Sequence, residues 1–521
     1  MKTVRENIWL LIFAGVVFLP GAALALEVET DITSDTAWGV ADSPVSINRS
    51  DFTVQSGAVL TIEPGVTVRV SDRFIVKGTL TVNGESGNPV RFEERDEGLG
   101  WLYMKLDRDS STNPNRLEYA EIRDLEYIWV SEQSAAFSHC TVIVSGDQNH
   151  VLRSFGGLYK PYPDLFLEIS DCFLSLDSSY SSGFTSSVSA VLLDGTDAVL
   201  DGNTIICEAT AANTIIAACR FHETNTGAYE VEFSGNTVEV RGLHPDIYET
   251  YGVYYEEATG SFSENTVIAD GPRKVFGLHY SHNPSLCRDN RIFAVTSGGG
   301  PGSYLYGIYS TAHSLGEEDL IVNNRIDLET DRPSRYLRGI FMQTGKVRGN
   351  RVTGFHTGTD SSSLYGIGQQ YYSGAIENNS IRLSAAEGVI CRGVAIGTNY
   401  NPSNTVSVKN NIISAPDASG ALGIYRDSAC QAEVENSYNL IHHFDTQFSG
   451  LTGGPGTISD DPLFADAELH LDSGSPGIDA GDPESPFGNE PLPNGGRINL
   501  GAYGNTAAAA RALSSPSPGP T

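Results

Sequence analysis

A short pattern that recurs ten times between residues 137 and 413 constrains the fold more than any other feature. Each copy has an apolar residue, two free positions, a small polar residue, one free position and an aliphatic residue. The polar members are Cys140, Cys172, Asn203, Asn236, Asn265, Asn290, Asn324, Asn350, Asn379 and Asn411. They stand 25 to 34 residues apart, and all twenty flanking positions are apolar. The chain is therefore built from supersecondary units of about thirty residues with loops of variable length.

The repeated units read as strands, because apolar residues alternate after each polar member, as at Asn236, Val238 and Val240. A second column, in which Gly precedes an aliphatic residue, adds another strand to each unit; its glycines are Gly252, Gly277, Gly307, Gly339, Gly366, Gly393 and Gly423. Units of this length bury their apolar faces by stacking. We therefore predict an all-β fold, a right-handed single-stranded parallel β-helix. Val238, Val267 and Ile292 are expected to stack in its core.

The asparagine column has two interpretations. An exposed row of amides would bind a ligand, whereas an internal row would bond from coil to coil as an amide ladder. Asn suits the bend between two strands, since it tolerates the left-handed conformation and its side chain bonds to neighbours. We expect the internal ladder.

The ends of the chain differ from the repeats. Lys2 and Arg5 precede an apolar run at 8–19, and Ala23 to Ala25 offer a small-residue cleavage site, which is typical of a secretory signal peptide. Beyond this leader no segment is long and apolar enough to span a membrane. We expect a secreted or cell-surface protein. Its predicted divisions are a signal peptide at 1–25, an N-terminal cap at 26–53, the β-helix at 54–441, an irregular closing segment at 442–511 and a Pro/Ser linker tail at 512–521.

The formal net charge of the whole chain is −31. This excess of acid argues against nonspecific binding to nucleic acid or anionic membranes. The spacing of cysteine and histidine predicts no zinc site, and no cofactor is expected. Cys140 and Cys172 occupy equivalent places in adjacent units, so they form either a disulfide or a stacked pair of buried thiols.

Several segments resemble secreted bacterial right-handed parallel β-helix proteins of the pectin-lyase-like superfamily. The entry segments are 60–68 (LTIEPGVTV), 75–80 (IVKGTL) and 88–92 (NPVRF). The end of the chain is similar to the terminal domain called choice-of-anchor Q, through 438–441 (YNLI), 461–464 (DPLF), 475–482 (SPGIDAGD) and 494–504 (NGGRINLGAYG). The resemblance implies a surface-associated protein, and it also requires a search for enzyme motifs.

Polysaccharide hydrolases of this fold share a Gly-His-Gly motif that the chain lacks, and the paired Asp460 and Asp461 fall in the closing segment. Pectate lyases share an Arg-x-Pro-x-x-Arg motif, for which the stretch 331–338 has the wrong register. Its arginines, Arg332, Arg335 and Arg338, form either a clamp for a uronate carboxylate or a solvated loop.

A candidate aromatic row lies two residues after the column glycines, at Tyr254, His279, Tyr309 and Phe341, and is interrupted by Gly368 and Ala395. Because the intervening aliphatic residues are expected to face inward, these rings are expected to face out, either stacking on sugar rings or covered by loops. Two functions remain. One is a noncatalytic surface protein that binds a polysaccharide or cell-surface glycan, and the other is a divergent polysaccharide lyase or glycoside hydrolase.

Overall fold

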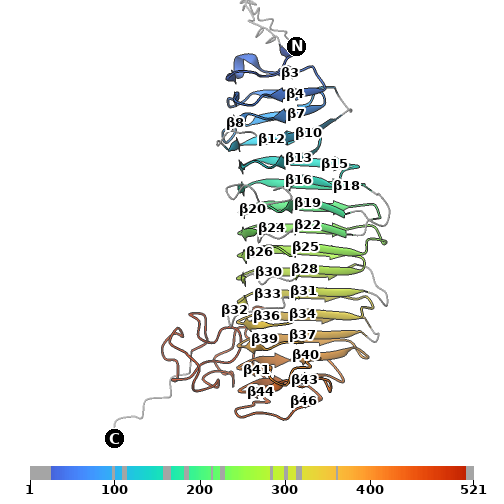
Figure 1. Cartoon of the computed structure of the whole chain (residues 1–521). Coiled ribbons are helices and arrows are strands. Elements are labelled where there is room, and N and C mark those ends of the chain that lie inside the picture. Colours follow the sequence, from blue (N-terminus) through green and yellow to red (C-terminus); the bar gives the residue numbers. More distant parts are fainter. Residues whose placement is uncertain are drawn as a thin grey trace, which may run out of the picture.

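The computed structural model describes residues 25–96, 100–107, 114–155, 166–180, 187–212, 215–222, 229–281, 286–297, 303–311, 319–358 and 362–511. The predicted signal peptide, apart from Ala25, and the predicted Pro/Ser tail lie outside these ranges. The strands form three all-parallel sheets of 16, 15 and 15 strands, and from β2 on every third strand along the chain belongs to the same sheet. Figure 1 shows the coils stacked along one axis. The protein is thus a parallel β-helix, as predicted from the repeats.

Sheet A contains the strands that follow the polar column: β1 (Leu26–Val28), β3 (Val45–Ile47), β6 (Thr67–Val70), β9 (Val90–Glu94), β12 (Ala120–Arg123), β15 (Thr141–Gly146), β18 (Phe173–Ser178), β21 (Thr204–Ala209), β24 (Thr237–Gly242), β27 (Thr266–Gly271), β30 (Arg291–Thr296), β33 (Arg325–Thr330), β36 (Arg351–His356), β39 (Ser380–Ala385), β42 (Ile412–Ser414) and β45 (Leu440–His442).

Sheet B contains the strands of the glycine column: β4 (Asp51–Val54), β7 (Arg73–Val76), β10 (Trp101–Leu106), β13 (Leu125–Ser131), β16 (His150–Phe155), β19 (Ser187–Asp194), β22 (Ile215–His222), β25 (Glu249–Glu256), β28 (Lys274–Ser281), β31 (Tyr304–Ser310), β34 (Tyr336–Met342), β37 (Ser363–Gln369), β40 (Ile390–Ile396), β43 (Leu422–Arg426) and β46 (Thr446–Ser449).

Sheet C contains the short strands that precede the polar column: β2 (Thr36–Trp38), β5 (Val59–Ile62), β8 (Thr79–Asn83), β11 (Asn115–Glu118), β14 (Ala135–Ser138), β17 (Phe166–Ser170), β20 (Asp197–Asp201), β23 (Glu230–Ser234), β26 (Thr259–Ser263), β29 (Leu286–Arg288), β32 (Asp319–Val322), β35 (Gly345–Arg348), β38 (Gly374–Glu377), β41 (Thr405–Lys409) and β44 (Glu433–Ser437).

The core is filled by the inward residues of all three sheets. Val238, Val267 and Ile292 are fully buried and lie in register on successive coils, as predicted. The parallel sheets begin earlier than expected, because β1 to β3 and a short 3-10 turn, η1 (Val40–Asp42), already form a coil within the segment 26–53. The alternating apolar residues Val45 and Ile47 pair with the next coil, so this segment is the first coil rather than a separate cap.

The asparagines form the internal ladder. The Nδ2 group of Asn236 donates to Oδ1 of Asn265 at 3.1 Å, and Asn265 repeats the bond to Asn290 at 3.0 Å. The ladder runs on to Asn439, one coil beyond the pattern read from the sequence. The left-handed backbone, however, belongs to the residue before each asparagine, such as Gly235 with φ 63°. The expected reason for choosing Asn is therefore wrong in this respect, and the amide bonds themselves explain the column.

The two cysteines continue the ladder toward the N-terminus. The Sγ atom of Cys172 accepts a hydrogen bond from the backbone N–H of Cys140 at 3.3 Å. The backbone N–H of Cys172 in turn donates to Oδ1 of Asn203 at 2.9 Å. All seven cysteines are free and buried. The stacked pair of thiols, and not the disulfide, is what the structure contains.

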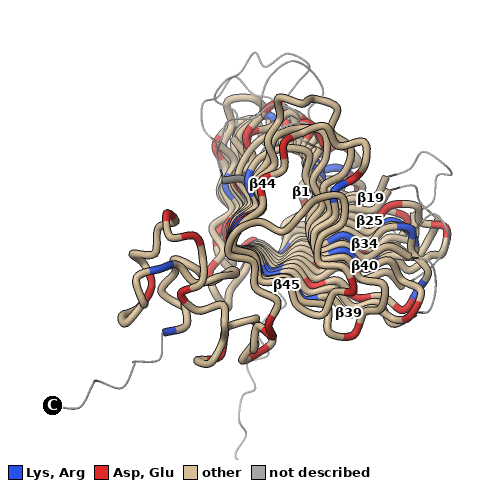
Figure 2. Tube along the Cα trace, turned by 90° about the horizontal axis from the view of Figure 1, so that it is seen from below, with Lys and Arg blue, Asp and Glu red and all other residues tan. Residues whose placement is uncertain are grey.

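The closing segment lies against the side of the last coils (Figures 1 and 2). Lys409 of β41 forms an ion pair with Asp482 at 3.2 Å, and Arg351 of β36 donates to the hydroxyl of Tyr503 at 2.9 Å. The β-helix extends past its predicted end at 441, because β46 (Thr446–Ser449) still pairs with β43 in sheet B, and the chain beyond it contains turns and isolated bridges. Asp461 accepts the N–H of Leu463 at 2.9 Å and so forms a turn.

Candidate functional site

The outer face of sheet B carries two adjacent rows of side chains instead of one. A Cβ added at Gly307 would lie 2.2 Å from a methyl of Ile326, so the glycine points inward, and the next residue, Ile308, is also in the core. Because two successive residues face inward, the residues on either side of the pair both face outward. Tyr306 and Tyr309 therefore lie together on the outer face, with ring centroids 4.7 Å apart.

We call the cluster that results the aromatic face. Its rings are Tyr251, Tyr254, Phe276, His279, Tyr304, Tyr306, Tyr309, Tyr336 and Phe341. Within one row, Tyr254 and His279 are stacked at 4.7 Å and Tyr309 and Phe341 at 5.1 Å. The rings of successive coils thus pack on one another outside the solenoid core.

The predicted row is on the outer face of the sheet, where the sequence placed it. Its rings are nevertheless largely covered by one another, since His279 is 9% and Phe341 is 4% exposed, while Tyr254 and Tyr309 are half-buried. Burial raises the pKa of the Tyr254 and Tyr309 phenols above their ordinary value. Both hydroxyls therefore stay protonated at neutral pH and remain hydrogen-bond donors.

The stack ends at Phe341, and a pocket begins there. Phe341 is in register with Gly368, which is followed by Ala395 and then Tyr425 on successive coils. The two small residues supply no ring, and they line a cavity of about 180 Å³. What the sequence shows as an interruption of the row is thus a pocket between two aromatic side chains. Its lining also includes Tyr336, Arg338, Tyr365, Gln369, Gln370, Arg392, Gly397 and Asp427.

Two arginines belong to this pocket. Arg338 lies 4.7 Å from the ring centroid of Phe341 and 5.2 Å from that of Tyr365. Arg392 lies 3.7 Å from the centroid of Tyr425 and 4.9 Å from that of Tyr365. Such cation–π contacts hold each guanidinium in place without neutralising its charge.

The three arginines of the predicted clamp are separated in the structure. Arg338 lines the pocket, whereas Arg335 is exposed and donates to the hydroxyl of Tyr304 at 3.4 Å. Arg332 is exposed and forms an ion pair with Asp331 at 3.1 Å. The sequence reasoning missed Arg392, whose signal was its position one residue before a column glycine, the same position that Tyr251 and Tyr306 occupy.

One carboxylate lines the pocket, that of Asp427. It accepts the hydroxyl of Tyr425 at 3.1 Å and the backbone N–H of Ala429 at 2.8 Å. Both of its oxygens are therefore engaged in local hydrogen bonds. Within the described ranges, no three His, Cys, Asp or Glu side chains converge as a metal ion would require, and no helix is long and apolar enough to cross a membrane.

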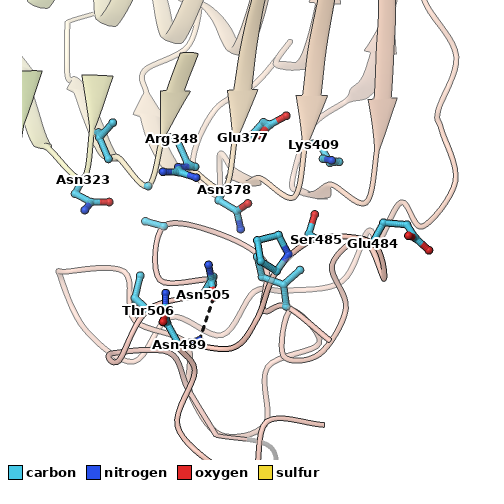
Figure 3. Close-up of a pocket in the computed structure, with 16 residues that line it drawn as sticks. Asn323, Arg348, Glu377, Asn378, Lys409, Glu484, Ser485, Asn489, Asn505 and Thr506 are labelled. Atoms are coloured by element: carbon cyan, nitrogen blue, oxygen red, sulfur yellow. Dashed lines mark hydrogen bonds between the residues drawn. The ribbon is translucent and has the colours of Figure 1, made fainter. Parts of the chain in front are cut away.

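A second and larger cavity, of about 320 Å³, lies where the closing segment meets the turns of the last coils (Figure 3). Arg348, Glu377 and Lys409 line it from the coils, and Glu484 and Ser485 line it from the closing segment. Its polar side chains bond across the contact: Asn410 beside it donates to Ser485 at 3.1 Å. This cavity therefore belongs to the polar contact between the closing segment and the coils.

Comparison with known protein families and with curated proteins finds no match for this chain.

Proposed function

We propose that the chain is an exported, surface-associated, noncatalytic protein that binds glycan on the outer face of sheet B. The observation that supports this proposal is the pocket at the end of the aromatic face. Phe341, Gly368, Ala395 and Tyr425 give the pocket a small apolar part, and the polar side chains of its lining, Arg338, Arg392, Gln369, Gln370 and Asp427, surround it. Sugars have faces of C–H groups and edges of hydroxyls, so they suit such a surface.

Export is supported by the basic start, apolar run and small-residue site of residues 1–25. The resemblance to secreted β-helix proteins of the pectin-lyase-like superfamily, and of the closing segment to the choice-of-anchor Q domain, supports a place at the cell surface. The enzymatic alternative has less support. Glycoside hydrolysis ordinarily uses a pair of carboxyl groups at the scissile bond, and the pocket is lined by Asp427 alone.

The geometry also corrects the way in which a sugar is expected to bind. The rings of the aromatic face stack on one another, so the faces of His279 and Tyr309 are occupied by neighbouring rings. A glycan that crosses the face meets ring edges and the hydroxyls of Tyr254 and Tyr309. Room for an inserted sugar ring lies beyond Phe341, where the stack ends. The pocket, and not the row, is therefore the proposed centre of binding.

The test is to fill the pocket while keeping the fold. Ala395→Tyr adds a ring at a position that already carries a Cβ and faces outward, so it extends the aromatic row into the cavity. Wild type should bind members of a glycan array, and Ala395→Tyr should lose that binding by at least about tenfold, which corresponds to about 1.4 kcal/mol. Thr266→Tyr, a half-exposed position on sheet A, is the matched control and should bind as wild type does.

Melting curves of the three proteins establish that each is folded. Binding that survives in folded Ala395→Tyr would exclude the pocket. Release of reducing ends or unsaturated products by wild type would overturn the noncatalytic part of the proposal.

A further inference from the structure

Arg338 is an unusual arginine for its surroundings. It is 9% exposed, and its guanidinium lies within 5.8 Å of four ring centroids, those of Tyr306, Tyr336, Phe341 and Tyr365. Its Nε is buried without a hydrogen-bond partner. A buried charge without a partner is costly, and buried guanidinium groups are ordinarily compensated by an anion.

Arg392, which also lines the pocket, is in a similar environment. Its Nη1 donates to the hydroxyl of Tyr365, and its Nε is also buried without a partner. Tyr365 thus contacts both guanidinium groups, which places the two arginines around one ring. No ion pair joins either of them to a carboxylate among the residues that the structure describes.

Several other basic side chains of sheet B have acidic partners, whereas Arg426 of β43 donates to the backbone carbonyls of Cys430 and Ala432. Arg220 pairs with Glu256, and Lys274 pairs with Glu249 at 3.0 Å. Arg73 and Lys105, nearer the N-terminus, pair with Asp51 and Asp107 at 2.8 and 3.1 Å. The pocket therefore holds two guanidinium groups and one carboxylate, that of Asp427, whose oxygens are bonded to the Tyr425 hydroxyl and the Ala429 N–H and form no ion pair with either arginine. Figure 2 shows basic segments at the strands around β34 and β40.

We propose that this pocket is an anion subsite that takes the charged group of an acidic sugar, a ring carboxylate or a sulfate ester. The inference rests on the proposed glycan-binding function and adds the ligand class to it. Arg338 and Arg392 donate hydrogen bonds to the anion, because the planar guanidinium fork matches the oxygens of both groups. The cavity lies below the lower end of drug-sized ligand pockets, about 300 Å³, so it admits a single ring or its substituent.

Recognition of the acidic sugar is expected to depend on contacts within the pocket and not on the charge of the whole protein. A net charge of −31 repels a polyanion at long range, so the affinity depends on short contacts within the pocket. Salt screens that repulsion between exposed charges more than it screens the partly buried arginines. Binding of an acidic glycan is therefore expected to resist added salt, unlike binding to an exposed basic patch.

The experiment compares matched oligosaccharides in three forms: neutral, oxidised at C6 to the uronate, and sulfated at O6. The set is made on β-1,4-glucan, β-1,4-mannan and α-1,4-galactan backbones, and affinities are measured for the full-length mature protein. Wild type should prefer a charged form over its neutral counterpart by about tenfold to a hundredfold, the range of a charge-assisted hydrogen bond. The uronate and sulfate arms identify which anion is preferred.

Arg392→Gln is the decisive variant, because this half-buried side chain can lose its charge with less effect on folding than Arg338. It should lose the preference for the charged form and keep the affinity for the neutral one. Arg332→Gln removes the same charge outside the pocket and should retain the preference. Equal wild-type affinity for neutral and charged forms would overturn the anion subsite but leave glycan binding in place. A preference that persists in folded Arg392→Gln would also overturn it, and no binding to any form would overturn both proposals.

Discussion

Replacing Asn265 by alanine removes one rung of the amide ladder while leaving the backbone of its coil intact. In the structure, Oδ1 of Asn265 accepts two hydrogen bonds from Asn236, from the backbone N–H at 2.9 Å and from Nδ2 at 3.1 Å. The Asn265 amide also donates from Nδ2 to the carbonyl of Phe233 at 3.0 Å and to Oδ1 of Asn290 at 3.0 Å. All three asparagines of this stretch are almost fully buried.

The magnitude follows from the groups that lose their partners. Without Asn265 Oδ1, the backbone N–H of Asn236 and one of its amide hydrogens have no acceptor in the dry interior. Oδ1 of Asn290 keeps the bond from the backbone N–H of residue 265, at 2.9 Å. Each buried donor that loses its acceptor costs about 1 to 3 kcal/mol. Because two donors lose their acceptor, Asn265→Ala should lower the free energy of unfolding by about 2 to 6 kcal/mol.

The assay combines denaturant unfolding with hydrogen exchange. The exchange of the Asn236 backbone amide should accelerate in the variant, because its acceptor is gone. Asn48→Ala is the control, since Asn48 is exposed and its Oδ1 accepts only a surface hydrogen bond, from Arg95 at 2.7 Å, so it should change stability by about 1 kcal/mol or less. An Asn265→Ala protein with the wild-type unfolding midpoint and an unchanged Asn236 amide would refute the ladder argument.

Three other outcomes are expected. Gly307→Ala should destabilise by about 1 to 3 kcal/mol through overpacking, because its Cβ would meet Ile326 at 2.2 Å, whereas Gly488→Ala, with open space around it, should be neutral in the same thermal melts. Val267→Asp should lower the denaturant midpoint far more than Val267→Ala, because it places an unpaired charge in the core. Burial lowers the pKa of His150 to about 4, below the ordinary 6.5, so the unfolded chain binds the extra proton first. The stability should therefore fall by about 3 kcal/mol as the pH is lowered from 6.5 to 4, and a His150→Gln variant should lack that part of the pH dependence.

The columns predicted the fold well because each reports a contact that repeats in every coil. An asparagine every thirty residues has a bonding partner one coil away, and a column glycine has a side chain of sheet A against it. Sheet C was harder to recognise in the sequence, because its strands are short. The main sign of it is the apolar residue three positions before each asparagine. The start of the solenoid at β1 was missed because the first coil lacks both columns.

The candidate site was only partly predictable. The row at Tyr254, His279, Tyr309 and Phe341 follows from alternation on one side of the column glycine. The second row, which includes Tyr306 and Arg338, required knowledge that two successive residues face inward there. Alternation counted through that pair places the second row on the wrong face. Arg392 joins Arg338 only because the coils stack in register across loops of different lengths, and loop length hides that register in the sequence.

The most direct test of glycan binding at the sheet B pocket is a crystal structure of the protein with the array's best-bound glycan. The account predicts a sugar in the pocket lined by Gly368 and Ala395, with a charged substituent in hydrogen-bond contact with Arg338 and Arg392. A glycan bound instead on sheet A, or in the polar cavity beside the closing segment, would contradict it.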